Sequence, residues 1–215
     1  MSDYNFFAAD GLDGCGKSTL LDKINAAFKE RGHPVAWVDE PGHYGEHEHL
    51  RRIMTDSSVN VDPSDKNMIR TLLMAADRVL SAAGIRKAIA KGNAVLSSRS
   101  FMSSVVYQGI VGGQLDLVTK IHQEAGLIFP SIIFVLRVSG ETSVRRMTHR
   151  GPMDDIEKDV ADRANQYAAA YDYAESFVRH ISGGKTKVIY LDGEASPDDI
   201  FAHAMAHIKE HMGWN

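Results

Sequence analysis

Five short apolar runs recur along the chain, separated by longer stretches in which apolar residues follow the spacing of a helix. The runs cover residues 5–9, 34–38, 93–97, 131–138 and 187–191. They are rich in Val, Ile and Phe and do not alternate strictly between apolar and polar positions, which is typical of strands buried on both faces of a sheet. We therefore predict five strands.

Helices are predicted in the stretches between these runs. They are expected over residues 17–31, 62–83 and 156–181, and after residues 196–199. At the start of the second helix, Asp62 can cap the first turn and Pro63 can occupy the first helical position. Because strands and helices alternate, we predict an α/β fold with a central parallel β-sheet of about five strands flanked by helices.

Length and composition limit the possible classes of protein. The chain has 215 residues, 44% of them hydrophobic, which is sufficient for one domain with one core. The formal net charge of -4 gives no indication of a nucleic-acid or membrane partner. A single cysteine fits a reducing compartment. Neither a signal peptide nor an apolar run of membrane-spanning length is recognised, so a cytoplasmic location is predicted.

A glycine-rich segment follows the first apolar run. Residues 11–18, GLDGCGKS, match G-x-x-x-x-G-K-[ST], in which glycines let backbone N–H groups turn inward around an anion. The helix beginning at Lys17 adds its positive end, the lysine reaches the outer phosphates, and the Ser18 hydroxyl can join a magnesium shell. We predict ATP and Mg2+ as cofactors in a P-loop NTP hydrolase-like fold. The predicted nucleotide-binding residues are Gly11, Asp13, Gly14, Cys15, Gly16, Lys17, Ser18 and Thr19, with Ser18 as the metal ligand.

Other segments indicate which kind of phosphate-loop protein this is. A GTPase requires Asn-Lys-x-Asp to read its base, which the sequence lacks. A motor or transport ATPase usually has an apolar strand that ends in Asp or Asp-Glu, whereas the third run continues as VLSSRS (95–100), which contains no acid. The segment 98–109 follows the third strand, at the edge where α/β sheets bind ligands. Residues 145–157, RRMTHRGPMDDIE, are basic and interrupted by Gly and Pro, as expected for a mobile lid.

Together these motifs resemble those of the thymidylate kinase family. The chain carries GLDGCGKST, EPG (40–42), LLMAADR (72–78), SRS (98–100), YQG (107–109) and RGPMDDIE (150–157) in the family's order and over nearly its whole length. The resemblance implies a single P-loop kinase domain over residues 1–215 with a mobile lid at about 145–157. It also implies a homodimer that transfers the ATP γ-phosphate to dTMP, or to a related pyrimidine deoxynucleotide, to give the diphosphate.

The resemblance also assigns roles to individual residues. Lys17, Arg99 and Arg150 are the implied catalytic residues. Arg99 would hold the acceptor 5′-phosphate, and Arg150 would close over the transferring phosphoryl group because the phosphate loop contains no arginine. The implied acceptor contacts are Asp13 with the sugar 3′-hydroxyl, Arg78 and Ser104 with the base, Tyr107 with base and sugar, and further contacts from Glu40, Met74 and Gln108.

Three residues differ from the family pattern. Ser98 stands where the family has Asp, which removes a carboxylate that would help to order magnesium waters. Met74 replaces a Phe that would stack on the base, and Asp10 replaces a Glu. Asp10 could take over part of the magnesium role, or it could bond to nearby backbone. The identity of the acceptor base and the rate therefore stay open.

Two other functions fit parts of the sequence. A deoxynucleoside kinase also has an Arg-Ser pair after its third strand, although Asp13 and the LLMAADR helix argue against this function. A nucleotide-binding protein that has lost catalysis is suggested by Ser98. Independently of function, Cys15 lies near Lys17 and a helix N-terminus, both of which favour a thiolate, so we predict a reactive thiol whose modification blocks ATP.

Overall fold

The computed structural model describes residues 4–42, 48–55, 62, 65–153 and 155–214. At its centre lies a five-stranded sheet in which every strand pair is parallel and the order is β2-β3-β1-β4-β5. The strands are β1 (Phe6–Asp10), β2 (Val35–Asp39), β3 (Ala94–Ser98), β4 (Ile132–Arg137) and β5 (Lys187–Asp192). Each starts within one residue of a predicted run, so the strand prediction and the α/β fold class are confirmed.

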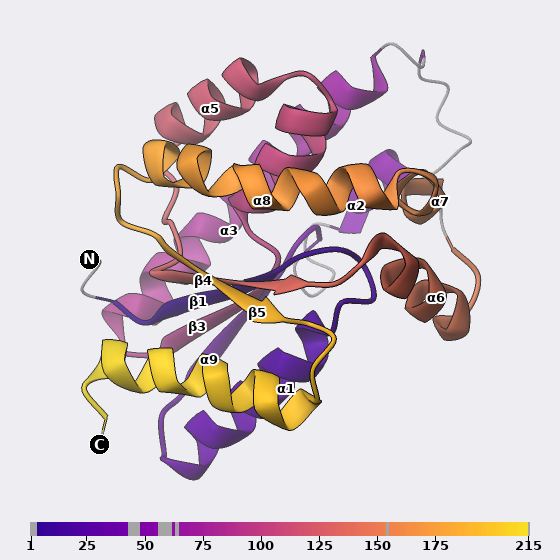
Figure 1. The fold of residues 1–215 in the computed structure, drawn as a ribbon. Helices are drawn as coiled ribbons and strands as arrows, with labels where there is room; N and C mark the ends of the chain where they lie inside the picture. The colour runs from indigo at the N-terminus through magenta and orange to yellow at the C-terminus, as the bar shows by residue number, and fades with distance from the viewer. Residues whose placement is uncertain (1–3, 43–47, 56–61, 63–64, 154, 215) are drawn as a thin grey trace.

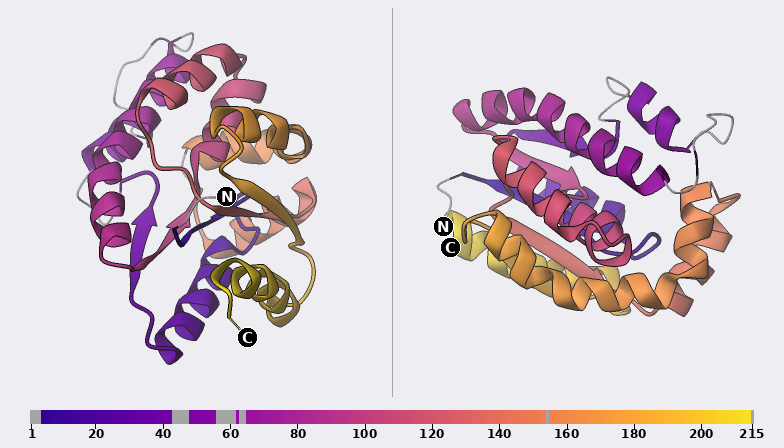
Figure 2. Two further views of the ribbon diagram at one scale, coloured as in Figure 1. Left: turned by 90° about the vertical axis from the view of Figure 1, so that its left-hand side faces the viewer. Right: turned by 90° about the horizontal axis from the view of Figure 1, so that it is seen from above.

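Helices cover both faces of the sheet. They are α1 (Lys17–Glu30), α2 (Glu48–Thr55), α3 (Lys66–Ala90), α4 (Phe101–Ser104), the π-helical η2 (Val105–Val111), α5 (Leu115–Glu124), α6 (Gly140–Arg150), α7 (Asp155–Asp162), α8 (Ala164–Ile181) and α9 (Pro197–Met212). In Figure 1, α1 and α9 lie below the sheet, and α5 and α8 lie above it. The views in Figure 2 show the same layers from the side and from above.

The central strands are the most deeply buried. All of β1 and the first five residues of β4 are buried, because helices pack on both faces of the sheet there. β2 is an edge strand whose first three residues are only half-buried, so the predicted burial on both faces does not hold for this run. Phe7, Leu96 and Phe134 are fully buried in the core, where each large side chain contributes about 1.5–3 kcal/mol.

Two predicted helices differ from the structure. The second begins at Lys66, with Asp65 as its N-cap, and continues to Ala90; the start predicted at Asp62 is therefore too early, and Pro63 lies outside the described residues. The helix predicted over 156–181 is interrupted at Arg163, which has non-helical backbone angles (φ -119°, ψ 18°). The interruption lets α7 turn toward the carboxyl ends of the strands.

Several short helices were not predicted from the sequence. They are α2, α4, η2, α5 and α6. α6 contains few apolar residues, and at its start the Ser139 hydroxyl accepts a hydrogen bond from the Thr142 N–H at 3.1 Å as an N-cap.

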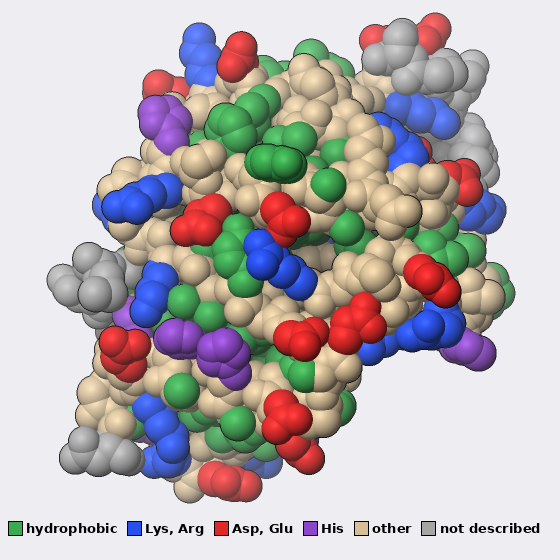
Figure 3. Space-filling view, in the orientation of Figure 1, with side chains coloured by type: hydrophobic (Ala, Val, Ile, Leu, Met, Phe, Trp, Pro, Cys, Tyr) green, Lys and Arg blue, Asp and Glu red, His purple; other side chains and the backbone are tan. Residues whose placement is uncertain are grey.

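The exterior carries charges of both signs. Acidic and basic side chains are interspersed over the face shown in Figure 3, in keeping with the small net charge. Among the helices that the structure describes, none combines the length and the apolar character needed to cross a membrane.

Candidate active site

A cleft of about 720 Å³ opens where the strands β1, β2 and β3 reach their carboxyl ends. This volume is within the range of small-molecule sites. The lining residues that the sequence had singled out are Asp13, Gly14, Gly16, Lys17, Ser18, Thr19, Glu40, Met74, Ser98, Arg99, Tyr107, Gln108 and Arg150. Motifs that lie far apart in the sequence therefore surround one cavity.

The phosphate loop connects β1 to α1 and depends on glycine at three positions. Gly11, Gly14 and Gly16 have φ values of 130°, 75° and 107°, which side chains with a Cβ rarely adopt. A Cβ on Gly11 would lie 2.7 Å from the carbonyl oxygen of Leu136, so the loop also needs glycine for close packing. Lys17 Nζ donates to the Gly11 carbonyl at 3.1 Å, which holds the amine above the loop.

One ion pair connects the phosphate loop with the end of β3. Arg99 donates to the carboxylate of Asp13, and Lys17 Nζ lies 3.7 Å from the same carboxylate. Burial alone would raise the pKa of Asp13, but Arg99 and Lys17 together lower it to about 2. Arg99 has a left-handed backbone (φ 74°), and its N–H donates to the Ala9 carbonyl at 2.9 Å. The acid is therefore a carboxylate at neutral pH, beside two fixed cations.

Asp10 is fully buried at the end of β1. Its carboxylate accepts hydrogen bonds from Ser100 Oγ at 2.8 Å, Ser103 Oγ at 2.7 Å, Tyr171 Oη at 2.7 Å and the Gly11 N–H at 3.1 Å. Of the two roles considered from the sequence, the structure favours the bonding role, because Asp10 does not line the cleft. It fixes the segment after β3 against the phosphate loop.

A magnesium ion would find oxygen ligands at the phosphate end of the cleft. Ser18 is exposed and lines the cleft beside Lys17. Ser98 and Asp39 are register partners on neighbouring strands and both line the cleft, so Asp39 brings a carboxylate close to the position where the family has one. Among the described residues, neither the cleft nor any other region groups three His, Cys, Asp or Glu side chains to hold a metal ion. The residues present thus fit a water-ligated Mg2+.

Aromatic and apolar side chains form another wall of the cleft. The ring of Tyr107 is stacked on that of Tyr167, with centroids 4.7 Å apart, and the Arg99 guanidinium carbon lies 5.5 Å from the Tyr107 centroid. Met74, on α3, is largely buried and lines the cleft, as does Gln108 on η2. This wall offers flat and polarizable surface to a planar ring.

Arg78 and Ser104 are placed differently from the other predicted contacts. Neither is among the described residues that line the cleft. Arg78 is buried behind Glu40 and donates to Glu40, to Ser104 Oγ and to the Ser100 carbonyl, each at 2.8–2.9 Å. Burial raises the pKa of Glu40, although Arg78 opposes the shift. A direct contact of Arg78 or Ser104 with a base stays a prediction.

The prediction of a reactive Cys15 thiol is wrong for this structure. Cys15 is 1% exposed, and its side chain belongs to the hydrophobic core. Burial raises its pKa even though Lys17 and Arg99 favour the thiolate. The glycine angles around Cys15 direct the side chain inward, so only its backbone can belong to the phosphate loop's binding surface.

The lid segment contributes two arginines to the cleft. Arg150, at the end of α6, pairs with Glu157 on α7. Arg146, one turn earlier, donates to the Gly193 carbonyl at 3.1 Å. Because Ser143 Oγ donates to the Asp13 carbonyl at 2.7 Å, α6 is attached directly to the phosphate loop.

Sequence reasoning missed several cleft residues. They are Asp39, Ser103, Asp159, Arg163 and Tyr167. Arg163 lies shortly after the basic lid segment 145–157, and this concentration of charge was a signal that could have identified it. Asp39 had no signal of its own, because its proximity to Ser98 follows from strand order.

Comparisons with known proteins agree with this geometry. The family model described as Thymidylate kinase matches residues 9–200. A thymidylate kinase from Mycoplasma mobile is 36% identical over 169 residues, covering 74% of this chain and 79% of the relative. A thymidylate kinase from Thermosipho melanesiensis is 32% identical over 199 residues, covering 92% and 94%. One from Chlorobium chlorochromatii is 27% identical over 213 residues, covering 94% and 93%.

Proposed function

Because this chain belongs to the thymidylate kinase family, we infer that it is a nucleoside monophosphate kinase that phosphorylates dTMP. The reaction transfers the γ-phosphoryl group of ATP to a 5′-phosphate oxygen of dTMP. The bond between the γ-phosphorus and the β–γ bridging oxygen breaks, and a new phosphorus–oxygen bond forms, giving ADP and dTDP. The observation that supports this most directly is the ion pair of Asp13 with Arg99, which brings the donor loop and the acceptor strand together.

We propose that the phosphate loop binds the donor as its magnesium complex. The loop N–H groups and Lys17 would bind the β- and γ-phosphates, and Ser18 would ligate the metal. Asp39 and Ser98 would hold its water ligands from the neighbouring strands. When bound, Mg2+ supplies charge neutralisation for the phosphates.

The acceptor would occupy the other end of the cleft. Arg99 would hold the 5′-phosphate of dTMP, and Asp13 would accept a hydrogen bond from the sugar 3′-hydroxyl. Tyr107 and Met74 would pack on the sugar and the base, and Gln108 would contact the base edge. This arrangement would place the donor phosphates on Lys17 and the acceptor phosphate on Arg99, so that the two reacting groups face each other for an in-line transfer.

The lid would complete the site. Residues 145–157 carry Arg146 and Arg150, and closure of this segment would bring Arg150 to the transferring group while excluding water. Water must be excluded because it competes with dTMP as an acceptor of the phosphoryl group.

We propose that the chain forms a homodimer through α3. Met68, Leu72 and Val79 are large apolar residues of this helix that are 40%, 50% and 45% exposed. Exposed apolar surface on one helix is typical of a buried interface. Light scattering should give twice the chain mass for the wild type and the chain mass for Leu72→Lys. The single-domain organisation and the cytoplasmic location stay predictions from the sequence.

A coupled ADP-release assay with Mg·ATP tests the function. The acceptors are thymidine, dTMP, dUMP and dCMP, each supplied separately. dTMP is expected to be the best acceptor. Turnover of thymidine without turnover of dTMP would instead support a deoxynucleoside kinase, and tight ATP binding without turnover on any acceptor would support a protein that has lost catalysis.

A further inference from the structure

The guanidinium of Arg78 makes hydrogen bonds through all three of its nitrogens. Its Nε and Nη2 both lie 2.8 Å from Oε2 of Glu40, its Nη2 also donates to the Ser100 carbonyl, and its Nη1 donates to Ser104 Oγ. The remaining N–H of Nη1 is directed at Nε2 of His122, 3.0 Å away. Every nitrogen of the guanidinium therefore has a hydrogen-bond partner, and its plane is fixed by Glu40, by Ser100 and Ser104, and by His122 on α5.

His122 is the member of this network whose role the reaction does not explain. It lies on α5, is completely buried, and faces Arg78 from α3 and the Phe101 ring from α4, with ring centroids 6.2 Å apart. Its Nδ1 is 2.7 Å from the carbonyl oxygen of Val118, one turn earlier on the same helix. Both ring nitrogens thus have partners.

The chemistry of the two partners determines the tautomer of His122. A carbonyl oxygen can only accept, so Nδ1 must carry the hydrogen that Val118 receives. A guanidinium can only donate, so Nε2 must be the unprotonated acceptor of the Arg78 hydrogen bond. A proton on Nε2 would place two N–H groups against each other, and burial together with Arg78 lowers the pKa of His122 to about 3.

The position of Arg78 in turn determines that of Glu40. The hydrogen bond from Arg78 Nε and the ion-pair contact of Nη2 both go to Oε2 of Glu40, so rotation of the guanidinium would rotate the carboxylate. Glu40 lines the cleft, whereas Arg78 and His122 do not. The contacts that run from His122 through Arg78 therefore end at Glu40, a side chain that a bound acceptor would contact.

We propose that His122 is a positioning residue for the acceptor site: its Nε2 holds Arg78, and through Arg78 it holds the Glu40 carboxylate in the cleft wall. This rests on the proposed function, since it assigns the Glu40 end of the cleft to dTMP. Loss of the Nε2 acceptor leaves a buried guanidinium N–H without a partner, which is costly, and the guanidinium is expected to turn toward another acceptor. The phosphate loop is not part of this chain of contacts.

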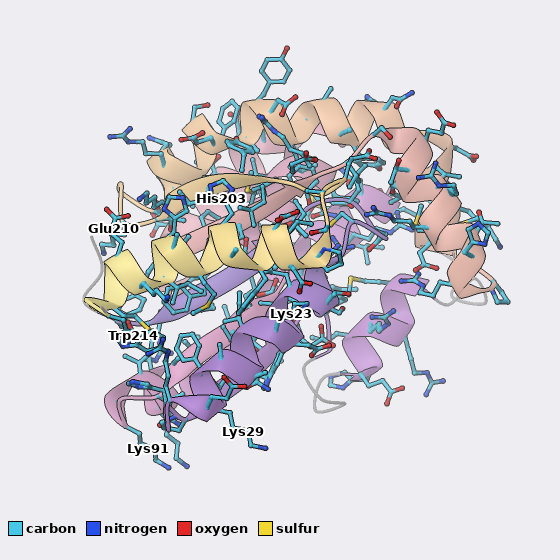
Figure 4. The ribbon with its side chains drawn as sticks, turned by 60° about the horizontal axis from the view of Figure 1, so that its bottom comes forward. Lys23, Lys29, Lys91, His203, Glu210 and Trp214 are labelled. Carbon is cyan, nitrogen blue, oxygen red and sulfur yellow. The ribbon has the colours of Figure 1, made fainter. Side chains whose placement is uncertain are left out.

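Two substitutions separate hydrogen bonding from packing. His122→Met keeps a large apolar side chain and removes the acceptor, whereas His122→Gln retains an acceptor that can reach Arg78. His203→Met is the matched control, because His203 is exposed on α9 (Figure 4), a helix that contributes no described residue to the cleft.

The measurements are kcat, the KM for dTMP at saturating Mg·ATP, and the Kd for ATP. We expect His122→Met to raise the KM for dTMP about tenfold, with the ATP Kd within about twofold of the wild type. His122→Gln should stay within about threefold of the wild-type KM, and His203→Met should not differ from the wild type. An unchanged KM in the Met variant, or equal losses in the Met and Gln variants, would overturn the proposal.

A spectroscopic measurement on the wild type does not depend on activity. Nitrogen-15 NMR of the imidazoles should show His122 as the neutral Nδ1–H tautomer at pH 7 and at pH 5. A proton on Nε2 at either pH would overturn the proposal, even if His122→Met fails to fold. Absence of dTMP phosphorylation by the wild type would contradict the proposed function instead, while calorimetric binding of dTMP and the NMR result would still decide the role of His122.

Discussion

Arg99 at the end of β3 donates a hydrogen bond to the carboxylate of Asp13 in the phosphate loop. The two residues are 86 positions apart in the chain. Their contact joins the segment that would bind the donor to the segment that would bind the acceptor phosphate, and it keeps both charges oriented in a partly buried site.

Replacement of Arg99 by Ala should impair acceptor binding most strongly. The 5′-phosphate of dTMP would lose its main cation, so the KM for dTMP should rise at least about tenfold and kcat should fall. Steady-state kinetics over a range of dTMP concentrations measure both. Arg137→Ala is the control, since Arg137 is half-exposed and pairs with Asp172 on the surface. An unchanged acceptor KM would remove Arg99 from the site.

Replacement of Arg150 by Ala should reduce kcat far more than ATP affinity. Arginines that stabilise the phosphoryl-transfer transition state are typically worth about 10³ in rate. The matched control is Arg145→Ala, because Arg145 lies on the same helix and donates to Thr142 rather than lining the cleft. If Arg150→Ala lost less than about threefold in kcat, Arg146 would be the next candidate, since it also lines the cleft.

Introduction of a ring at Met74 should narrow the range of acceptors. Met74 lines the cleft from α3 and can pack on a base without aromatic stacking. Met74→Phe is therefore expected to raise the ratio of kcat/KM for dTMP to that for dCMP by about threefold or more. Identical ratios for dTMP, dUMP and dCMP before and after the change would place residue 74 outside the base pocket.

Labelling of the single cysteine should require unfolding. The Cys15 thiol is buried, so a reagent cannot easily reach it in the folded chain. Burial also raises its pKa, which lowers the fraction of reactive thiolate. N-ethylmaleimide at pH 7.5 should react at least about tenfold more slowly with native than with urea-unfolded protein, as followed by intact mass. Rapid stoichiometric labelling of the native protein would restore the reactive thiol inferred from the sequence.

The buried His122 should make stability decrease with falling pH. Its pKa is lowered from 6.5 to about 3 by burial and by Arg78. Below pH 6.5 the unfolded chain gains a proton that the folded chain does not bind until about pH 3, so unfolding becomes easier across this window. From pH 6.5 to pH 5 the loss should be about 2 kcal/mol.

Urea unfolding at pH 6.5 and pH 5 measures this loss. The experiment compares the wild type with His122→Gln, in which the group cannot titrate. Equal losses of unfolding free energy in the two proteins would mean that His122 is protonated in the folded state.

The sheet and the phosphate loop could be predicted because their signals are local. Buried parallel strands need continuous apolar runs, and a loop with three positive φ angles needs glycine at those positions. The order of the remaining motifs identified which residues belong to one cleft. Of these, Arg99 and Met74 line it as expected.

The directions of individual side chains could not be predicted, because they depend on contacts between distant segments. Cys15 belongs to the same phosphate loop as Lys17, but its side chain points into the hydrophobic core. Arg70, Met74 and Arg78 share a helix face by spacing, yet Arg70 and Met74 line the cleft while Arg78 turns to Glu40, which is 38 residues away. The break between α7 and α8 at Arg163 could not be predicted either, because no Gly or Pro lies near it in the sequence.

The hydrogen bonds that Arg78 makes inside the protein have a consequence for inhibitor chemistry. A compound with a carbonyl aimed at this guanidinium must first displace Glu40, Ser104, the Ser100 carbonyl or His122, and the exchange of one buried hydrogen bond for another yields little affinity. Donor groups directed at the Glu40 carboxylate, on a flat scaffold that stacks against Tyr107, would meet a prepared acceptor instead. Inhibitors of this site should therefore be designed to bind Glu40 and not Arg78.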